Sequence, residues 1–326
     1  MDVAATVAEL AGLVRAGDRR ALARSITLVE STREDDRAEA TALLDEILPD
    51  TGRAIRVGIT GTPGAGKSTF VEELGTRLTG EGHRVAVLAI DPSSRRSGGS
   101  ILGDKTRMER LARDPDAFIR PSPSGGTLGG VARRTREAGL LCEAARFDVV
   151  VVETVGVGQS ETAVADMVDC FVLLVAPGGG DELQGIKRGI IELADIIVVN
   201  KSDGDLAPAA GRAVADYHSA VHLLRPKHPG WEVPVLPASA LEGTGITEVW
   251  DAIERLETHL GATGVRDGLR SAQAVTWLWD EIRETLLDDF RGDPHVSTRW
   301  SAIEAAVRNG LQTPAAAARE LLRERS

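Results

Sequence analysis

The chain has 326 residues, of which 42% are hydrophobic, and a formal net charge of -11 at pH 7. That length and apolar content can bury the core of a domain of about 200 residues with smaller additions, while the acidic balance argues against nucleic acid or an anionic membrane as partners. The first residues lack the positive segment of a signal peptide, no apolar run approaches the ~18 residues of a membrane span, and the two cysteines match no metal-ligand spacing, so we expect a cytoplasmic protein.

Residues 1–52 predict a helical arm without catalytic chemistry. Three apolar stripes run through it at helical spacing; Asp18 is a good N-cap for the second, and Pro49 ends the third. Short amphipathic helices need a surface on which to bury their apolar faces. We therefore expect the arm to pack on the domain that follows or on a partner.

Residues 53–261 alternate between apolar runs and helical patterns, which predicts an α/β fold with a doubly wound, mostly parallel sheet. Several runs are apolar at every position, as expected of parallel strands that are buried on both faces. In such sheets ligands bind outside the carboxyl ends of the strands. The predicted strands are 55–60, 84–90, 116–120, 147–153, 169–175, 195–200 and 233–238.

Residues 262–326 predict a helical extension. Gly261, Gly264 and Gly268 indicate a linker at its start; two long apolar stripes at helical spacing follow, and a last helix begins near Pro314. Ordinary packing within the chain is one explanation of these stripes. A dimerisation element is the explanation we favour, because the tail is short and apolar.

The strand at 55–60 is followed by a match to the G-x-x-x-x-G-K-[ST] phosphate-binding loop, Gly61-Thr62-Pro63-Gly64-Ala65-Gly66-Lys67-Ser68. Its glycines let backbone N–H groups face a phosphate, and the N-terminus of the next helix adds positive partial charge. Lys67 is expected to reach the β- and γ-phosphates, and Ser68 to offer its hydroxyl to Mg²⁺. Thr69 completes the predicted contact set.

The strand at 195–200 ends in Asn200-Lys201-Ser202-Asp203. The Asp203 carboxylate can accept from both N1–H and N2–H₂ of guanine, which adenine cannot match, and the Lys201 stem can cover the base. A plain turn is the alternative, since all four residues favour turns. The position after a phosphate loop favours GTP and GDP as ligands, and Ser239-Ala240-Leu241 is expected to support the base through backbone N–H groups.

Three carboxylates are candidates for holding Mg²⁺ and the attacking water. Asp91 and Glu153 end predicted strands, and Asp104 follows a glycine-rich stretch. Carboxylates that face a phosphate loop can bind the metal directly or through its waters; for Asp104, capping of a following helix is an open alternative. Gly156 is placed to donate its N–H to the γ-phosphate.

The segment 177–187, Pro-Gly-Gly-Gly-Asp-Glu-Leu-Gln-Gly-Ile-Lys, follows a buried strand. Three consecutive glycines before a charged helix start predict a hinge, and a surface loop is the alternative. A hinge would let Asp181 and Lys187 adopt two arrangements, which is the minimum needed to couple a nucleotide to a partner.

Together the segments GTPGAGKST, AIDPSS, GDKTRM, VVETVGVGQSE, APGGGDELQGIK and NKSD closely resemble the MeaB/ArgK family, and the resemblance extends over nearly the whole chain. Members of that family are homodimeric accessory G proteins of adenosylcobalamin-dependent methylmalonyl-CoA mutase. The resemblance implies that GTP hydrolysis gates delivery of the cofactor to the mutase and protects or reactivates the mutase.

The resemblance also implies roles for individual residues. Catalysis would involve Lys67, Asp91, Glu153 and the switch residue Lys187. Ser68 would bind phosphate and Mg²⁺, and Asp91, Asp104 and Glu153 would surround Mg²⁺ and the attacking water. Asp181 and Lys187 would be the charged members of a third switch. Asn200, Lys201 and Asp203 would bind guanine.

Other functions stay open at this point. The partner could be another acyl-CoA mutase. A nickel-inserting GTPase would call for His- or Cys-rich stretches, whereas the six histidines are scattered. The family's older label, a kinase of amino-acid transport, finds no amino-acid pocket or second phosphoacceptor signature. An ATPase of the MinD type would carry an extra lysine near Thr62 and Pro63. A scaffold with an inactive nucleotide site is a further alternative. GTP turnover that is abolished by Lys67→Ala would exclude it.

Overall fold

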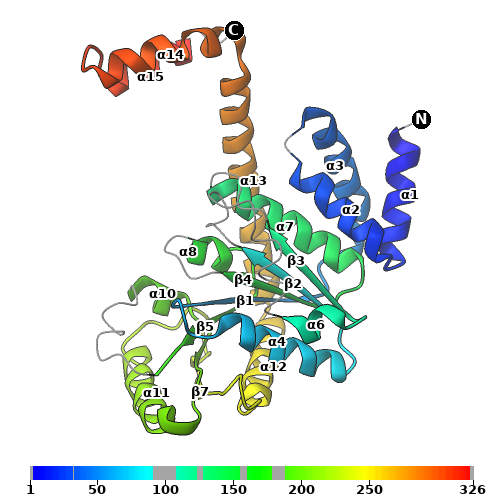
Figure 1. Ribbon diagram of the computed structural model, residues 1–326, viewed down its shortest axis with the longest axis vertical. Coiled ribbons are helices and arrows are strands. Elements are labelled where there is room, and N and C mark those ends of the chain that lie inside the picture. The colour runs from blue at the N-terminus through cyan, green and yellow to red at the C-terminus, as the bar shows by residue number, and fades with distance from the viewer. Residues whose placement is uncertain are drawn as a thin grey trace. The chain divides into compact units, whose positions relative to one another are not determined.

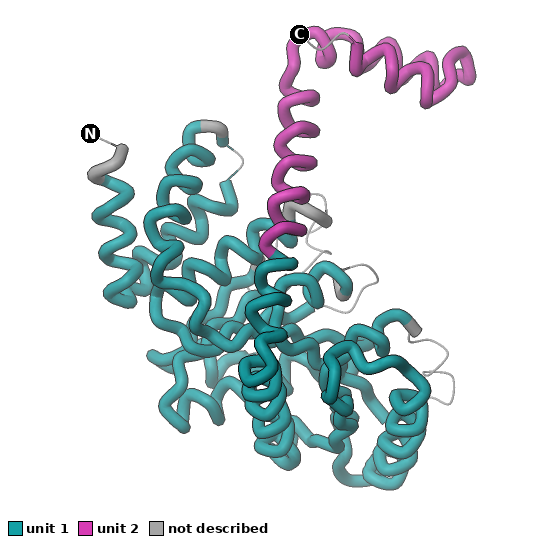
Figure 2. The backbone as a smooth tube through the Cα atoms, turned by 180° about the vertical axis from the view of Figure 1, so that it is seen from behind, with its two compact units in different colours: residues 1–273 teal, residues 274–326 magenta. Residues whose placement is uncertain are grey.

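The computed structural model describes residues 3–31, 33–90, 108–122, 128–154, 160–177 and 188–323. The chain divides into two compact units, residues 1–273 and 274–326, which are coloured teal and magenta in Figure 2. No helix in the described ranges has both the length and the apolar character that a bilayer crossing requires.

The first unit is built on a seven-stranded sheet in which every neighbouring pair of strands is parallel. The strand order is β3-β2-β4-β1-β5-β6-β7, so β4 is inserted between β1 and β2. The predicted α/β fold with a parallel sheet is therefore confirmed. The strands are β1 (Ile55–Gly61), β2 (Val85–Ile90), β3 (Ala117–Ser122), β4 (Val149–Thr154), β5 (Cys170–Val175), β6 (Ile196–Val199) and β7 (Val235–Pro237).

Helices cover both faces of the sheet (Figure 1). On β5 the side chains alternate between two cores: Val172 and Leu174 belong to one, and Leu173 and Val175 to the other. The first face packs on α4 (Lys67–Gly80), α6 (Glu109–Arg113) and α12 (Ile246–Ala262). The second face packs on α7 (Leu128–Ala144), α8 (Ser160–Ala165), α10 (Arg188–Leu193) and α11 (Ala207–Val221), the last preceded by η3 (Gly204–Leu206).

Both cysteines belong to these cores. Cys142 lies on α7 and Cys170 begins β5, and both are buried and free. Burial raises the pKa of each thiol, which keeps it protonated near neutral pH. The cysteines therefore serve as apolar packing residues, as their sequence context suggests.

The helical arm belongs to the first unit and packs on α7 at one face of the sheet. It consists of α1 (Val3–Arg15), α2 (Arg19–Glu30), α3 (Glu34–Ile47) and η1 (Leu48–Asp50), and its apolar stripes share one core with α7. Asp18 caps α2 as predicted, because its Oδ1 accepts a 2.7 Å hydrogen bond from the Ala21 N–H. We expected the arm to pack either on the following domain or on a partner, and in the structure it packs on the domain.

The linker indicated by Gly261, Gly264 and Gly268 is a short turn in the structure. Helix α12 runs to Ala262 and α13 (Val265–Gly292) begins two residues later, with the turn at Gly264, whose φ is +69°. Gly268 lies inside α13, where no added Cβ would meet an atom within 4 Å. The low helix propensity of one glycine does not end the helix, and a little further along α13 Gln273 Nε2 donates to Val168 O at 2.8 Å.

The second unit contains the rest of α13 with α14 (Pro294–Arg308) and α15 (Pro314–Arg323). This confirms the three helices expected from the apolar stripes. Pro314 starts α15, a position where the missing N–H of proline costs nothing. The core of the unit is small and consists of Val296, Ile303, Ala317 and Leu321, with Phe290 and Val307 packed against it.

Candidate functional site

The phosphate-loop match lies between β1 and α4, at the carboxyl edge of the sheet. Glycine is required at two of its positions. A Cβ on Gly61 would lie 2.0 Å from Leu174 O of the neighbouring strand, and a Cβ on Gly66 would lie 2.7 Å from Asn200 Nδ2. Gly66 also has a φ of +86°, which favours glycine. The loop is therefore held against β5 and the segment after β6.

Lys67 spans this loop from the first turn of α4. Its side chain is buried, and its Nζ donates to Gly61 O at 2.9 Å and to Thr62 O at 3.1 Å. Gly66 caps α4 without a side-chain acceptor, so the first amides of the helix face outward from its N-terminus. An ammonium group beside these amides makes a site for an anion such as a phosphate.

Ser68 and Glu153 are brought together from α4 and β4. Ser68 Oγ donates to Glu153 Oε1 at 2.8 Å, and Glu153 is buried in register with Ile59 of β1. A hydroxyl and a carboxylate are oxygen ligands of the kind that Mg²⁺ prefers, so these side chains fit such an ion. The described ranges contain no cluster of three or more His, Cys, Asp or Glu side chains that could hold a metal by themselves.

Asn200, directly after β6, connects two loops. Its Nδ2 donates to Ala65 O of the phosphate loop at 2.8 Å, and its Oδ1 accepts from the Ala240 N–H at 3.0 Å. All of these groups are buried, so water cannot replace the bonds at low cost. The amide of Asn200 therefore sets the spacing between the phosphate loop and the segment after β7.

Asp203 and Ser239 form the other end of the site. Ser239 Oγ donates to Asp203 Oδ2 and accepts from the Glu242 N–H at 3.1 Å, so the carboxylate is held by a side chain that is itself fixed. Lys201 is exposed, adopts a φ of +59°, and has its Cε close to Gly66. The Lys201 stem thus lies between the Asp203 carboxylate and the phosphate loop, where it can cover a flat ring.

The residues of the segment 239–241, which lies shortly after β7, differ in what their amides do. Ser239 N–H donates to Thr244 O at 2.9 Å, and Ala240 N–H is used by Asn200. Leu241 is 83% exposed. The Ser239 and Ala240 amides thus bond within the protein, and Ser239 also donates through its hydroxyl to Asp203.

Several predicted site residues lie outside the described residues: Asp91, Asp104, Gly156, Asp181 and Lys187. The described residues bring together the other predicted members of the site in two groups. One group is residues 61–69 with Glu153, and the other is Asn200, Lys201 and Asp203 with the segment 239–241.

Two contacts at this edge of the sheet were not predicted from the sequence. Ser239 was expected to act only through its backbone but also donates through its hydroxyl to Asp203, and the hydroxyls of Thr60 and Thr154 are 2.9 Å apart. A signal for the threonines was present, because each is a polar residue near the carboxyl end of a mostly apolar strand. Nothing in the sequence indicated that these two strands would be neighbours.

The profile of the family described as methylmalonyl Co-A mutase-associated GTPase MeaB matches residues 22–295. A protein of Caulobacter vibrioides described as a GTPase is 59% identical, over 94% of this chain and 94% of its own length. The mouse protein named methylmalonic aciduria type A homolog, mitochondrial, is 51% identical over 96% of this chain and 77% of its own.

Among solved structures, one titled LAO/AO transport system kinase matches with a TM-score of 0.76 and 44% sequence identity. The match covers 98% of this chain and 97% of that one. The likeness therefore extends over both units of the chain and is not limited to the phosphate loop.

Proposed function

This chain belongs to the methylmalonyl-CoA mutase-associated GTPase family, MeaB, and hydrolyses GTP, and from that premise we propose that it is an accessory protein of a mutase. In this proposal GTP hydrolysis gates the loading of adenosylcobalamin onto methylmalonyl-CoA mutase and protects or reactivates that enzyme. The observation that carries the nucleotide part is the Asn200 bridge, which joins a phosphate-binding end to a base-binding end in one site.

At the phosphate end the chain's own residues bind and orient the nucleotide. Lys67 would exchange the carbonyls of Gly61 and Thr62 for phosphate oxygens, and the amides of residues 61–69 would surround the β-phosphate. These contacts exist in the ground state, so they account for affinity more than for rate.

Bound Mg²⁺ would neutralise charge on the phosphates as they react. Ser68 and Glu153 would hold it, because their oxygens already lie 2.8 Å apart beside the phosphate loop. Asp91 and Asp104 complete the proposed set. Glu153 would hold the attacking water in place, either directly or through a water of the ion.

At the base end Asp203 would accept from N1–H and N2–H₂ of guanine, with Ser239 keeping the carboxylate in one orientation. Lys201 would cover one face of the ring. Leu241, which is exposed beside this segment, offers an apolar surface and an amide to the base. The base end therefore selects GTP over ATP by hydrogen-bond pattern.

Coupling to the mutase is proposed to run through the segment 177–187. Asp181 and Lys187 would contact the nucleotide in one arrangement and the mutase in the other. Gly156 would donate its N–H to the γ-phosphate, so its position would change when GTP is hydrolysed. We expect slow hydrolysis by the chain alone and faster hydrolysis with the partner, as when an outside protein completes a GTPase site.

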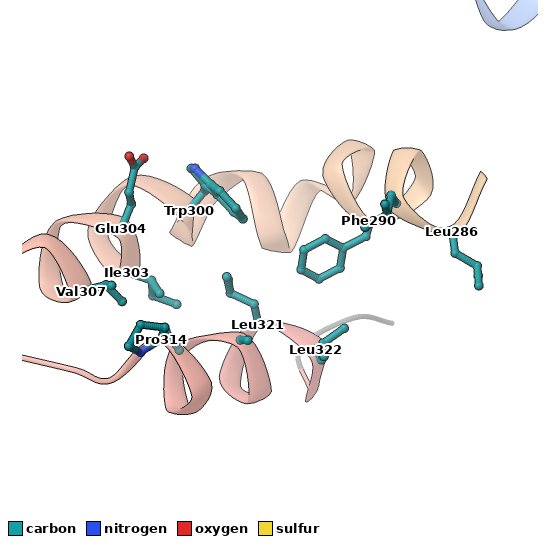
Figure 3. A pocket seen from close by; sticks show the side chains of 12 residues that line it. Leu286, Phe290, Trp300, Ile303, Glu304, Val307, Pro314, Leu321 and Leu322 are labelled. Carbon is teal, nitrogen blue, oxygen red and sulfur yellow. The ribbon is translucent and has the colours of Figure 1, made fainter. Parts of the chain in front are cut away.

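A homodimer is proposed through the second unit. Its core is too small for a stable domain by itself, and α13 to α15 border a groove of about 550 Å³ whose apolar side chains are drawn in Figure 3. Ile303 and Leu321 point into the space between α14 and α15. The exposed large apolar residues of this unit are Val275, Leu278, Trp279, Ile282, Leu286, Leu287, Trp300, Leu311 and Leu322.

The proposal is tested by single-turnover GTP hydrolysis with and without adenosylcobalamin-dependent methylmalonyl-CoA mutase. Wild type should be stimulated by the mutase, and EDTA should stop hydrolysis. Lys187→Ala should keep its GTP affinity, hydrolyse more slowly alone, and lose most of the stimulation; normal stimulation of this variant would contradict the switch role. A transport-system kinase would instead transfer the phosphate to an acceptor, so release of all the label as inorganic phosphate excludes that function.

A further inference from the structure

Two threonines lie where the central strands β1 and β4 end. Thr60 Oγ1 and Thr154 Oγ1 are 2.9 Å apart, and both residues are 0% exposed. Their other neighbours in the same row of the sheet are apolar, because Thr60 pairs with Leu173 of β5 and Thr154 with Ile90 of β2. The two hydroxyls therefore make a polar contact in the middle of an apolar row.

The contact lies just beyond the end of the backbone pairing between β1 and β4. That pairing runs from Ile55–Val149 to Ile59–Glu153 and stops there. Each strand continues further with its other neighbour, β1 as far as Gly61 with β5 and β4 as far as Thr154 with β2. At the position where the phosphate loop begins, the hydroxyl pair is thus the connection between the two strands.

Stability alone does not call for this pair. Valine has the shape of threonine, and replacing both partners of a buried hydrogen bond by apolar groups of the same shape is nearly neutral. A hydrogen bond adds a fixed separation and direction, since it weakens steeply away from its preferred geometry. Apolar contact between two valines would tolerate more sliding of the strand ends.

Glu153 lies next to the hydroxyl pair on β4 and also contacts the helix that follows the phosphate loop. It precedes Thr154, and strand alternation directs its side chain to the opposite face of the sheet, where Ser68 Oγ donates to it. Glu153 is therefore held in two ways. Ser68 binds its side chain, and the neighbouring Thr154 holds the end of β4 through its hydrogen bond to Thr60, which lies on the strand that leads into the phosphate loop.

We propose that Thr60 and Thr154 are positioning residues for GTP hydrolysis. Their hydroxyl pair holds the ends of β1 and β4 at the separation at which Glu153 and the phosphate loop act on the same nucleotide. The inference rests on the proposed role of Glu153. It predicts a loss in kcat without a loss in nucleotide affinity, because the loop that binds the phosphates is itself unchanged.

The test compares full-length variants in Mg²⁺-dependent single-turnover hydrolysis, GDP titration and thermal unfolding. Thr154→Val alone leaves the buried hydroxyl of Thr60 without its partner, and it should lower both Tm and kcat. The double variant Thr60→Val with Thr154→Val should recover most of the Tm. Its kcat should stay about 3- to 10-fold below wild type, the size expected for one lost hydrogen bond, with unchanged KM and GDP affinity.

The matched control is the double variant Thr60→Ser with Thr154→Ser, which keeps both hydroxyls and removes two buried methyl groups. Its Tm should fall because of the cavities, while its kcat should stay within about twofold of wild type. Wild-type kcat in the double valine variant would overturn the inference. A double serine variant as slow as the double valine variant would do so too, as would equal losses of kcat and nucleotide affinity.

Glu153→Gln separates this inference from the proposed function. If Glu153→Gln hydrolyses GTP normally, the role of Glu153 is wrong and the inference falls with it. If Glu153→Gln is inactive while the double valine variant is fully active, only the positioning role of the threonines is wrong.

Discussion

At the scale of the residue, the surroundings of the Asp203 carboxylate support the proposed recognition of guanine. The hydroxyl of Ser239 donates to its Oδ2, and the Glu242 amide in turn fixes that hydroxyl. A carboxylate held in this way can present two acceptors in a constant direction, which is what N1–H and N2–H₂ of guanine require. Chemistry and orientation therefore come from different residues.

Asp203→Asn should weaken GTP binding by roughly 10- to 100-fold, because one of the two acceptors becomes a donor. The same amide can donate to the carbonyl of xanthine, so affinity for xanthosine triphosphate should rise. Titration with fluorescent nucleotide analogues measures both. Ser239→Ala is the matched control, since it loosens the carboxylate without changing its chemistry and should not favour xanthine. Undiminished GTP affinity in Asp203→Asn would contradict the base assignment.

At the scale of the element, two contacts join segments that are far apart in the chain. Asn200 joins the phosphate loop to the segment after β7. Arg270, in the part of α13 that belongs to the first unit, binds both carboxylate oxygens of Asp169 at 2.8 and 2.7 Å and also donates to Gly52 O and Ala54 O. Asp169 accepts from the Arg56 N–H at the start of β1. One contact thus organises the carboxyl edge of the sheet and the other its amino edge.

Asn200→Ala should lower GTP and GDP affinity by about 10- to 100-fold, because Ala65 O and the Ala240 N–H lose a buried partner and the two loops lose their fixed spacing. Isothermal titration of both nucleotides measures the change. Ser202→Ala, in the same tetrad, removes only a bond to Val199 O and should bind nearly as wild type does. If Asn200→Ala and Ser202→Ala lose the same affinity, the bridge does not have the role given to it here.

Arg270→Met should lower the free energy of unfolding by about 3 kcal/mol, because it leaves the carboxylate of Asp169 buried without its cation. The Asp169 side chain is 1% exposed and that of Arg270 15%. Arg283→Met breaks an ion pair to Asp280 in which the arginine side chain is 67% exposed, and it should change stability by less than ~0.5 kcal/mol. Denaturant unfolding of both variants makes the comparison, and similar losses would argue against the buried pair as an anchor of α13.

At the scale of the whole molecule, the two units differ in what they can bury. The first has a sheet that is covered on both faces, whereas the second has a core of four buried side chains beside many exposed apolar ones. Small helical units of this kind gain stability by pairing. Assembly is therefore the property that we assign to the second unit, and nucleotide chemistry to the first.

Removal of residues 274–326 should leave a folded, monomeric protein that still binds GDP, while the full chain should be a dimer. The cut belongs after Gln273, since Arg270 and Gln273 are bonded to Asp169 and Val168 within the first unit. Light scattering gives the mass of each, and GDP titration shows that the shortened chain is folded. A shortened chain that remains dimeric would place the interface in the first unit.

The sequence by itself determined the elements and the chemical groups of this protein. Apolar runs predicted all seven strands, and the phosphate loop and the Asn200–Asp203 tetrad were recognisable because their backbone and side-chain requirements are met by consecutive residues. The linker expected to reach Gly268 ends before it, because that glycine lies inside α13 and a single residue of low helix propensity does not end a long helix.

Only the tertiary structure decided which of these groups meet. Ser68 and Glu153 are 85 positions apart in the chain, Thr60 and Thr154 are 94 apart, Asp169 and Arg270 are 101 apart, and Ala65 and Asn200 are 135 apart. Each contact depends on the strand order, above all on the insertion of β4 between β1 and β2. Hydrophobic patterning indicates that a strand is buried but not which strand lies beside it. Runs such as β2 and β5 are apolar on both faces, so several neighbours would pack against them equally well.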